Sequence, residues 1–221
     1  MTLINEIVIF SVTAYSCCIN CNSELQQAIS ESFYLNISMF ASFVILALIV
    51  FALSYFSTKK PSNSNEFSFV PLTCAAVILG IGIGGFIDGI ILHQILQWHE
   101  MLSNKLPPNT LIYKSVNMFW DGIFHLFTLI TTIIGIYFLW KLTNRININK
   151  SGFLLSGGLL AGWGIFNLVE GIINHHILEL HNVREISSDK YLWNYGFLIF
   201  SIILLIIGRQ LIRKGQYKTV F

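Results

Sequence analysis

Five long apolar stretches, separated by short polar segments, dominate the pattern of hydrophobic and polar positions along the chain. A transmembrane helix needs about 20 mostly apolar residues, and each stretch meets that length. Because unpaired backbone groups are not tolerated against lipid, such stretches form helices. The pattern predicts an all-α, polytopic membrane helix bundle with five transmembrane helices, at about 33–56, 69–98, 115–140, 152–178 and 191–212.

The basic residues between the stretches indicate how the bundle is oriented. Lysine and arginine follow the first, third and fifth stretches, and by the positive-inside rule these ends lie in the cytoplasm. The other connecting segments mix a few basic residues with acidic ones, so they are expected outside. We therefore predict a multi-pass protein of the cell membrane with a cytoplasmic C-terminus.

Composition agrees with this class. The 221 residues are 54% hydrophobic and 11% charged, and their mean hydropathy is +0.68. A soluble domain is far less apolar and carries more charge. The net charge of +2 is too small to indicate nucleic-acid binding. The lipid bilayer is the one partner that the composition predicts.

An extracytoplasmic N-terminal segment, residues 1–31, is expected before a single transmembrane domain at 32–221. Apolar residues 3–14 are short for a span and lack the basic leading region of a secretory signal, although a cleaved signal stays an alternative. Cys17, Cys18 and Cys21 fall in this segment. An oxidising compartment favours a disulfide or plain thiols there over a soft-metal or redox CxxC site.

Two segments within the apolar stretches share one polar pattern. GFIDGIILHQILQWHE at 85–100 returns in altered form as NLVEGIINHHILELHN at 167–182, and the fifth stretch aligns loosely with the third. We therefore predict a tandem two-helix repeat, at about 69–140 and 152–212, related by an axis along the membrane normal. The paired positions are Asp88 with Glu170, Gly89 with Gly171, His93 with His175, His99 with His181, Trp120 with Trp193, Asp121 with Asn194, Phe124 with Phe197 and Gly135 with Gly208.

Ionisable side chains are costly within a membrane and are candidates for function there. The alternating helix directions collect the six histidines and three carboxylates of these spans in one outer layer. Imidazole and carboxylate together suit zinc or iron. The sequence predicts a nonhaem site for one or two divalent transition metal ions near the extracytoplasmic face. The candidate residues are Asp88, His93, Asp121, His125, Glu170 and His175, with His99 and His181 at its mouth.

In an ideal α-helix, Asp88 and His93 would not point toward the same ion. At about 100° per residue, His93 lies roughly 140° around the helix from Asp88. Either a π-bulge brings residues five apart onto one face, or the carboxylate orients a histidine on another helix. His99 and His181 lie about 16 Å along the axis from the paired carboxylates, which ranks them below the other histidines unless the helix ends and folds back.

Other interpretations stay open at this point. The same residues could form only interhelical hydrogen bonds, bind haem through two histidines, or carry protons or metal ions across the membrane. Transport is disfavoured because few polar side chains continue inward from the cluster: Thr128, Thr131, Thr132 and Ser156. In an enzyme, the metal would activate water or O₂ against a lipid-phase or extracytoplasmic substrate. The residues assign no reaction.

The motifs GFIDGIILHQILQWHEML, WDGIFHLFTLITTIIG and GWGIFNLVEGIINHHILELHNVRE resemble those of a bacterial family of predicted multi-pass membrane proteins of unknown function. The resemblance covers about 79–208. It implies an integral membrane location and carries no activity to transfer. The chain departs from the family pattern at Asn194, where the resemblance leads us to expect an aspartate.

Overall fold

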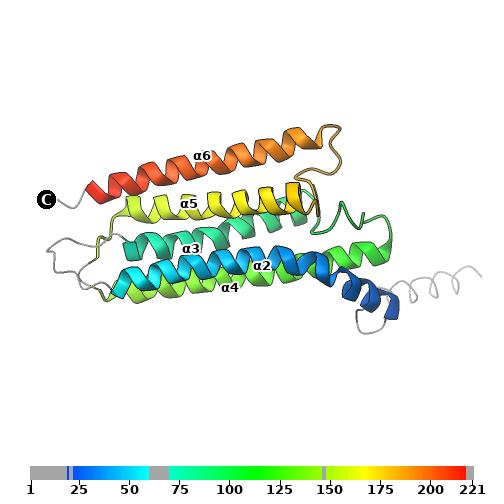
Figure 1. Cartoon of the computed structure of the whole chain (residues 1–221), viewed down its shortest axis with the longest axis horizontal. Helices are drawn as coiled ribbons and strands as arrows, with labels where there is room; N and C mark the ends of the chain where they lie inside the picture. The colour runs from blue at the N-terminus through cyan, green and yellow to red at the C-terminus, as the bar shows by residue number, and fades with distance from the viewer. Residues whose placement is uncertain (1–18, 20–21, 60–69, 146–147, 218–221) are drawn as a thin grey trace, which may run out of the picture.

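The computed structural model describes residues 19, 22–59, 70–145 and 148–217, which form a bundle of long helices (Figure 1). Five helices in this part of the chain are long and apolar enough to cross a membrane. The predicted all-α bundle with five membrane-spanning helices is confirmed. The apolar segment 3–14 and the cysteines at 17, 18 and 21 lie outside the described residues.

Several observed helices differ from the predicted spans at their ends, and the largest difference is at the start of the first. The first helix begins at Ser23, well before the expected start, because the side chain of Asn22 accepts a hydrogen bond from the Leu25 amide and caps it. The second ends at Ile95, before the expected Trp98. The elements are α2 (Ser23–Lys59), α3 (Val70–Ile87), the π-helix η2 (Asp88–Ile95), α4 (Leu111–Thr143), α5 (Gly152–Glu170), the π-helix η3 (Gly171–Ile177) and α6 (Lys190–Tyr217).

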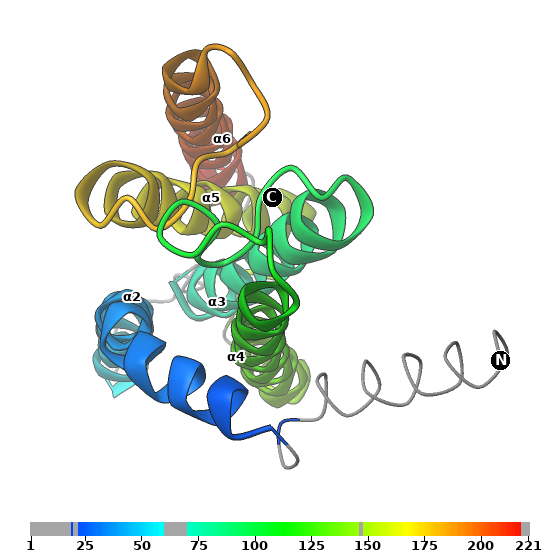
Figure 2. The ribbon, with the colours of Figure 1, turned by 90° about the vertical axis from the view of Figure 1, so that its right-hand side faces the viewer.

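Helices α3 and α5 form the centre of the bundle. Helix α4 packs on α3, α6 packs on α5, and α2 lies along α3 and α4 (Figure 2). Helix α6 therefore stands on the flank of the bundle opposite α4. Both π-helices continue the two central helices, so η2 and η3 leave the bundle at the same end.

Glycines bring the backbones of the two central helices into contact. A Cβ atom on Gly80 would lie 2.2 Å from the Leu159 carbonyl oxygen, and one on Gly162 would lie 2.1 Å from the Val77 carbonyl oxygen. Small residues of this kind are how membrane helices approach closely. The contact sets the heights of α3 and α5 relative to each other, and so the heights of η2 and η3.

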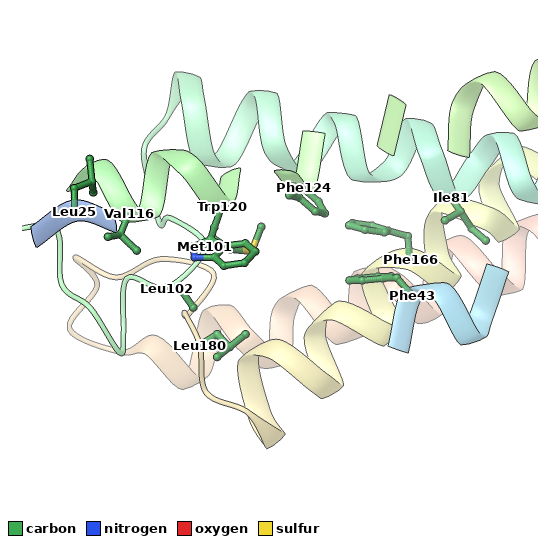
Figure 3. Close-up of a cluster of buried hydrophobic side chains, with 10 residues drawn as sticks. All are labelled: Leu25, Phe43, Ile81, Met101, Leu102, Val116, Trp120, Phe124, Phe166 and Leu180. Carbon is green, nitrogen blue, oxygen red and sulfur yellow. The ribbon is translucent and has the colours of Figure 1, made fainter. Parts of the chain in front are cut away.

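A cluster of apolar side chains fills the space between α2, α4 and the central helices (Figure 3). Phe43 of α2 stacks on Phe166 of α5 with ring centroids 5.3 Å apart. The Trp120 indole lies in the same cluster and donates a hydrogen bond of 2.8 Å to the Ser32 hydroxyl. This hydrogen bond satisfies the polar atom of the indole inside an apolar core.

We expect Gly162→Ala to lower the unfolding temperature in detergent, because its methyl group overlaps the Val77 carbonyl and forces α3 and α5 apart. Overpacking of this kind costs about 1–3 kcal/mol. Gly122→Ala is the control, since a Cβ there meets nothing within 4 Å, and removal of a helical glycine adds up to about 1 kcal/mol of stability. Equal unfolding temperatures for the two variants would contradict the close α3–α5 contact.

Candidate metal centre

Each central helix changes to π-helical winding where the repeated polar motif begins. Helix α3 becomes η2 at Asp88, and α5 becomes η3 at Gly171. In a π-helix the backbone bonds join residues five apart, so such residues share a face. The Nε2 atom of His93 accordingly lies 3.2 Å from Oδ2 of Asp88. The π-helical alternative from the sequence is confirmed.

Each π-helix ends in a turn of the same type. The amide of Leu96 donates to the Ile91 carbonyl at 2.8 Å, and the amide of Leu178 donates to the Ile173 carbonyl at 2.7 Å. The next residues, Gln97 and Glu179, adopt the left-handed conformation with φ of 48° and 49°. A left-handed residue commonly terminates a helix and reverses the chain, and it is usually glycine. Here two residues with side chains fill that position.

The turns lead into two loops, 96–110 and 178–189, that hydrogen-bond to each other. The amide of Glu185 donates to the Trp98 carbonyl at 2.9 Å, and the amide of Asn104 donates to the Leu180 carbonyl at 3.0 Å. Burial of the Glu185 carboxyl opposes its ionisation, but hydrogen bonds from Lys190 and Asn182 outweigh burial and lower its pKa. The paired loops cover this end of the bundle.

His99 and His181 are held by reciprocal hydrogen bonds between the loops. The His99 Nδ1–H donates to the Val183 carbonyl at 2.8 Å, and the His181 Nδ1–H donates to the Met101 carbonyl at 2.9 Å. Each acceptor stands two residues after the other histidine. The two rings stack with centroids 4.6 Å apart and planes 6° apart. Their Nε2 atoms are buried and have no hydrogen-bond partner.

One polar side chain on α4 and one on α6 each hold a loop in place. Asp121 Oδ1 accepts from the Met101 amide at 3.0 Å, and Asn194 Oδ1 accepts from the Val183 amide at 3.0 Å. Asp121 also accepts from His93 Nδ1 at 2.9 Å. A carboxylate thus orients a histidine on another helix, but this carboxylate is Asp121 and not Asp88, the residue for which the sequence offered this alternative.

The remaining histidine and glutamate complete a buried polar cluster. His175 has no hydrogen-bond partner at either ring nitrogen, and Oε2 of Glu170 has none either. The Oε1 atom of Glu170 lies 3.5 Å from Nε2 of His181. We call six side chains the ligand cluster: Asp88, His93, His99, Glu170, His175 and His181. All six are 4% exposed or less.

The ligand cluster contains three overlapping sets whose donor atoms lie within 4.8 Å of one another. They are His93 with His99 and His181, Glu170 with His175 and His181, and Asp88 with His93 and Glu170. Shared members join the sets into one group. Burial lowers the pKa of His99 well below its usual range, and the neighbouring imidazoles act in the same direction. The neutral imidazole is the form that binds metal ions.

The geometry changes the predicted ranking of the histidines. His99 and His181, expected only at the mouth, lie inside the ligand cluster because the helices end and the chain folds back. His125, expected among the leading ligands, is in none of the three sets, and its Nδ1–H donates to the carbonyl of Asp121 on its own helix. Asp121 touches His93 but belongs to no set. His176 likewise bonds its own helix, at the Gly171 carbonyl.

Sequence reasoning did not find the groups that orient the outer histidines. The acceptors are backbone carbonyls, of Met101 and Val183, which no residue type identifies. One signal was present, because these residues occupy matching positions after the paired histidines. The role of Asn194 in anchoring Val183 could be sought in the same way, from its pairing with Asp121.

Comparison with known proteins gives one match. A family model described as "Predicted membrane protein (DUF2243)" matches residues 75–215. The match includes both π-helices, both loops and the whole ligand cluster. Neither the search of curated proteins nor the search of solved structures gives a match.

We expect Asp121→Ala to destabilise the protein, because it removes the acceptor of both His93 Nδ1 and the Met101 amide. Each buried group left without a partner costs about 1–3 kcal/mol. Thermal unfolding in detergent measures the loss. His125→Ala, one turn away on α4, is the matched control and leaves the ligand cluster intact. An unfolding temperature for Asp121→Ala as high as that of the control would contradict the anchoring role.

Proposed function

The chain belongs to the DUF2243 family of predicted membrane proteins, and from the site described above we propose that it is a membrane metalloprotein. In this proposal the ligand cluster holds one or two nonhaem transition metal ions, with zinc or iron suited to its donors. One observation carries the proposal. Buried imidazole nitrogens and carboxylate oxygens from η2, α5, η3 and both loops face one another without hydrogen-bond partners.

The cost of such an arrangement supports a bound ion. A buried polar atom without a partner costs about 1–3 kcal/mol, and this cluster gathers several of them at one place. In the part of the chain that the structure describes, most buried polar atoms without a partner belong to the cluster. A metal ion would satisfy these atoms together, which separate hydrogen bonds within the cluster do not do.

The hydrogen bonds on the far side of the rings point to the same role. Metal-binding histidines usually donate their other ring N–H to a carbonyl or carboxylate, which fixes the ring and leaves the second nitrogen free for the ion. His99 and His181 donate to carbonyls, and His93 donates to Asp121. These three rings have the support that a metal site requires.

Ring packing favours a nonhaem centre over haem. Two axial histidines bind haem iron from opposite faces of a flat macrocycle. His99 and His181 instead stack face to face, and His93 lies edge-on to His99 with centroids 4.3 Å apart. Such packing suits ligands that converge on small ions.

The interior below the cluster favours a site over a transport route. The hydroxyls of Thr128, Thr131 and Thr132 all donate to carbonyls of their own helix. The glycine contact between α3 and α5 closes the centre of the bundle, with Gly82 also packed on Thr132. Among the described residues, the polar groups therefore do not continue as a chain from the cluster to the other end.

Charge supports an extracytoplasmic position for the cluster. The C-terminal ends of α4 and α6 and the start of α5 lie at the opposite end of the bundle (Figure 1), and the segments there contain Lys141, Arg145, Lys150, Arg213 and Lys214. At the cluster end, Lys114 pairs with Glu100 and Lys190 pairs with Glu185. An excess of lysine and arginine marks the cytoplasmic side of a membrane protein. A zinc or iron ion bound here would supply a Lewis acid or activate water, so we extend the proposal to a membrane enzyme.

We expect His175→Ala to reduce the metal content of the purified protein, because it removes a donor from the set with Glu170 and His181. The control is His176→Ala, which changes the adjacent histidine on the same π-helix and should retain the wild-type content. Elemental analysis of protein purified without added metal measures both. An absorption spectrum of the same samples separates haem from iron without haem and from zinc.

The combined variant His99→Ala, His181→Ala extends this test. We expect it to lose most of the bound metal, since both residues belong to sets with His93 or Glu170. Size-exclusion chromatography checks that the variant remains folded. Wild-type protein without metal after expression in zinc- or iron-supplemented medium would overturn the proposal, and so would equal metal contents in the folded variants and the His176→Ala control.

A further inference from the structure

A cleft of about 520 Å³ opens on the flank of the bundle between η2 and α6, with α5 as its floor. Its walls are almost entirely apolar and include Ile91, Trp163, Trp193, Phe197 and Phe200. Two polar side chains also line it, Asp88 of the ligand cluster and Asn167. The volume is within the range of sites for small molecules.

We propose that this lateral cleft binds the apolar body of a lipid-phase molecule and directs a hydrogen-bond-donating head, such as a hydroxyl group, toward Asp88 and Asn167. The proposal that the cleft binds such a molecule rests on the shape and lining of the cleft and does not depend on the metal centre. The inference that the bound molecule is the substrate of the metal centre rests on the proposed function. It assigns to that centre a class of substrate, long-chain molecules with a hydroxyl or similar head, delivered from within the bilayer.

The polar end of the cleft presents acceptor atoms. Asn167 is 2% exposed and Asp88 is 3% exposed, so both are buried from water. Oδ1 of Asn167 and Oδ1 of Asp88 have no hydrogen-bond partner. A head group that donates a hydrogen bond would satisfy these oxygens, whereas a hydrocarbon or an ether would leave them unpaired. A head group bound by Asp88 would also lie close to His93, because Oδ2 of Asp88 is 3.2 Å from Nε2 of His93.

The way into the cleft lies on the side of the bundle. Its rim carries exposed apolar side chains, Ile91, Leu192 and Phe200. Toward the loops, Trp98 and Trp193 pack together with ring centroids 5.0 Å apart, and Arg184 lies over both rings. These residues cover the loop end of the cleft, so an apolar molecule enters from the lipid.

On the opposite flank of the bundle, the corresponding surface is covered by apolar side chains. There the chain itself supplies the cover, because α2 packs against α4 and the central helices. Phe40 lies 6.2 Å from Trp120, and Phe43 lies 5.7 Å from Phe127 and 5.3 Å from Phe166, between ring centroids. The flank against α4 is therefore filled with apolar groups.

The predicted repeat pairs these two flanks. Positions on α4 that α2 covers correspond to positions on α6 that line the cleft: Trp120 with Trp193, Phe124 with Phe197, and Phe127 with Phe200. On the α6 flank the described residues supply no helix equivalent to α2. The cleft is thus the uncovered counterpart of a surface that binds apolar side chains.

The length of the cleft favours a small molecule over a partner helix. Its lining on α6 runs from Leu192 to Phe200, about 12 Å of helix. Beyond it α5 and α6 come into contact, and a Cβ on Gly164 would lie 2.9 Å from the Ser201 carbonyl oxygen. A transmembrane helix needs a groove of about 30 Å to pack along its length. A long-chain alcohol can bend its tail into the surrounding lipid.

The test uses the full chain in lipid nanodiscs and a C16 alcohol that carries a photoreactive diazirine and an alkyne handle. Mass spectrometry locates the label after irradiation. Gly196→Phe fills the cleft, because Gly196 lines it and a Cβ there meets nothing within 4 Å. Gly122→Phe is the matched control on α4, where a Cβ also meets nothing within 4 Å. We expect labelling at 87–98 and 192–200 in wild type and control, and its loss in Gly196→Phe.

A second comparison tests the head group. We expect the alcohol to outcompete its methyl ether about five- to tenfold for the labelled site in wild type, as expected for one hydrogen bond of about 1 kcal/mol. Asn167→Leu should reduce this preference while it retains labelling of the cleft walls. An equal preference in wild type and Asn167→Leu would remove the role proposed for Asn167.

Metal content measured on the same samples separates this proposal from the metal centre. Gly196→Phe that keeps its metal but loses the label supports the cleft as a binding site. Labelling of Gly196→Phe equal to wild type overturns the cleft, whatever the metal content. If the wild-type protein contains no metal but is labelled, and Gly196→Phe is not labelled, the cleft is supported and the metal centre is ruled out. If the wild-type protein is an unlabelled dimer and Gly196→Phe is a monomer, the cleft is occupied by a second copy of the chain, and this result overturns the proposal.

Discussion

Imidazole and carboxylate groups buried in a membrane protein need partners, and this requirement shapes the whole cluster end of the structure. Three of the four clustered histidines satisfy one ring nitrogen through a carbonyl or carboxylate and turn the other inward. The winding of η2 and η3, the reversal at Gln97 and Glu179, and the contact between the loops all serve this arrangement. The π-helical winding is rare, and the left-handed backbone of Gln97 and Glu179 is costly for residues with side chains.

The glycine contact between α3 and α5 supplies the rigid base for this arrangement. It holds the two π-helices at one height, so that residues from separate spans meet within hydrogen-bonding or ligand distance. The outer helices then anchor the loops through Asp121 and Asn194. Positioning by helices is more exact than positioning by loops alone. The cluster therefore depends on helix packing well below it.

Most of the fold follows from the sequence by simple rules. The apolar stretches predict the five helices because an unbroken apolar stretch of about 20 residues satisfies its own backbone in lipid only as a helix. The spacing of Asp88 and His93 conflicts with ideal α-helical geometry, and the conflict itself indicates π-helical winding. The fold-back could not be predicted. Gln97 and Glu179 occupy left-handed positions where the usual signal is glycine, so no residue signalled that the chain brings His99 and His181 back to the cluster.

The side-chain direction of His125 could not be predicted either. Its spacing from Asp121 placed the two side chains on one face of α4, which is correct, but the ring turns to its own helix backbone instead of to the centre. Periodicity gives the face of a helix and not the rotamer of a side chain. The hydrogen bond to the Asp121 carbonyl and the close approach of Gly89 on η2 to the ring fix the side-chain rotamer here.

The exchange of Asp121 for Asn194 in the matching position has a consequence for the electronic character of the cluster. Both side chains anchor a loop amide in the same way, but only the aspartate also accepts from a clustered imidazole. A carboxylate makes the ring it touches a stronger electron donor, whereas a neutral amide does not. In the proposed metalloprotein, an ion bound by His93 would therefore be held more tightly than one bound only by histidines without such a carboxylate.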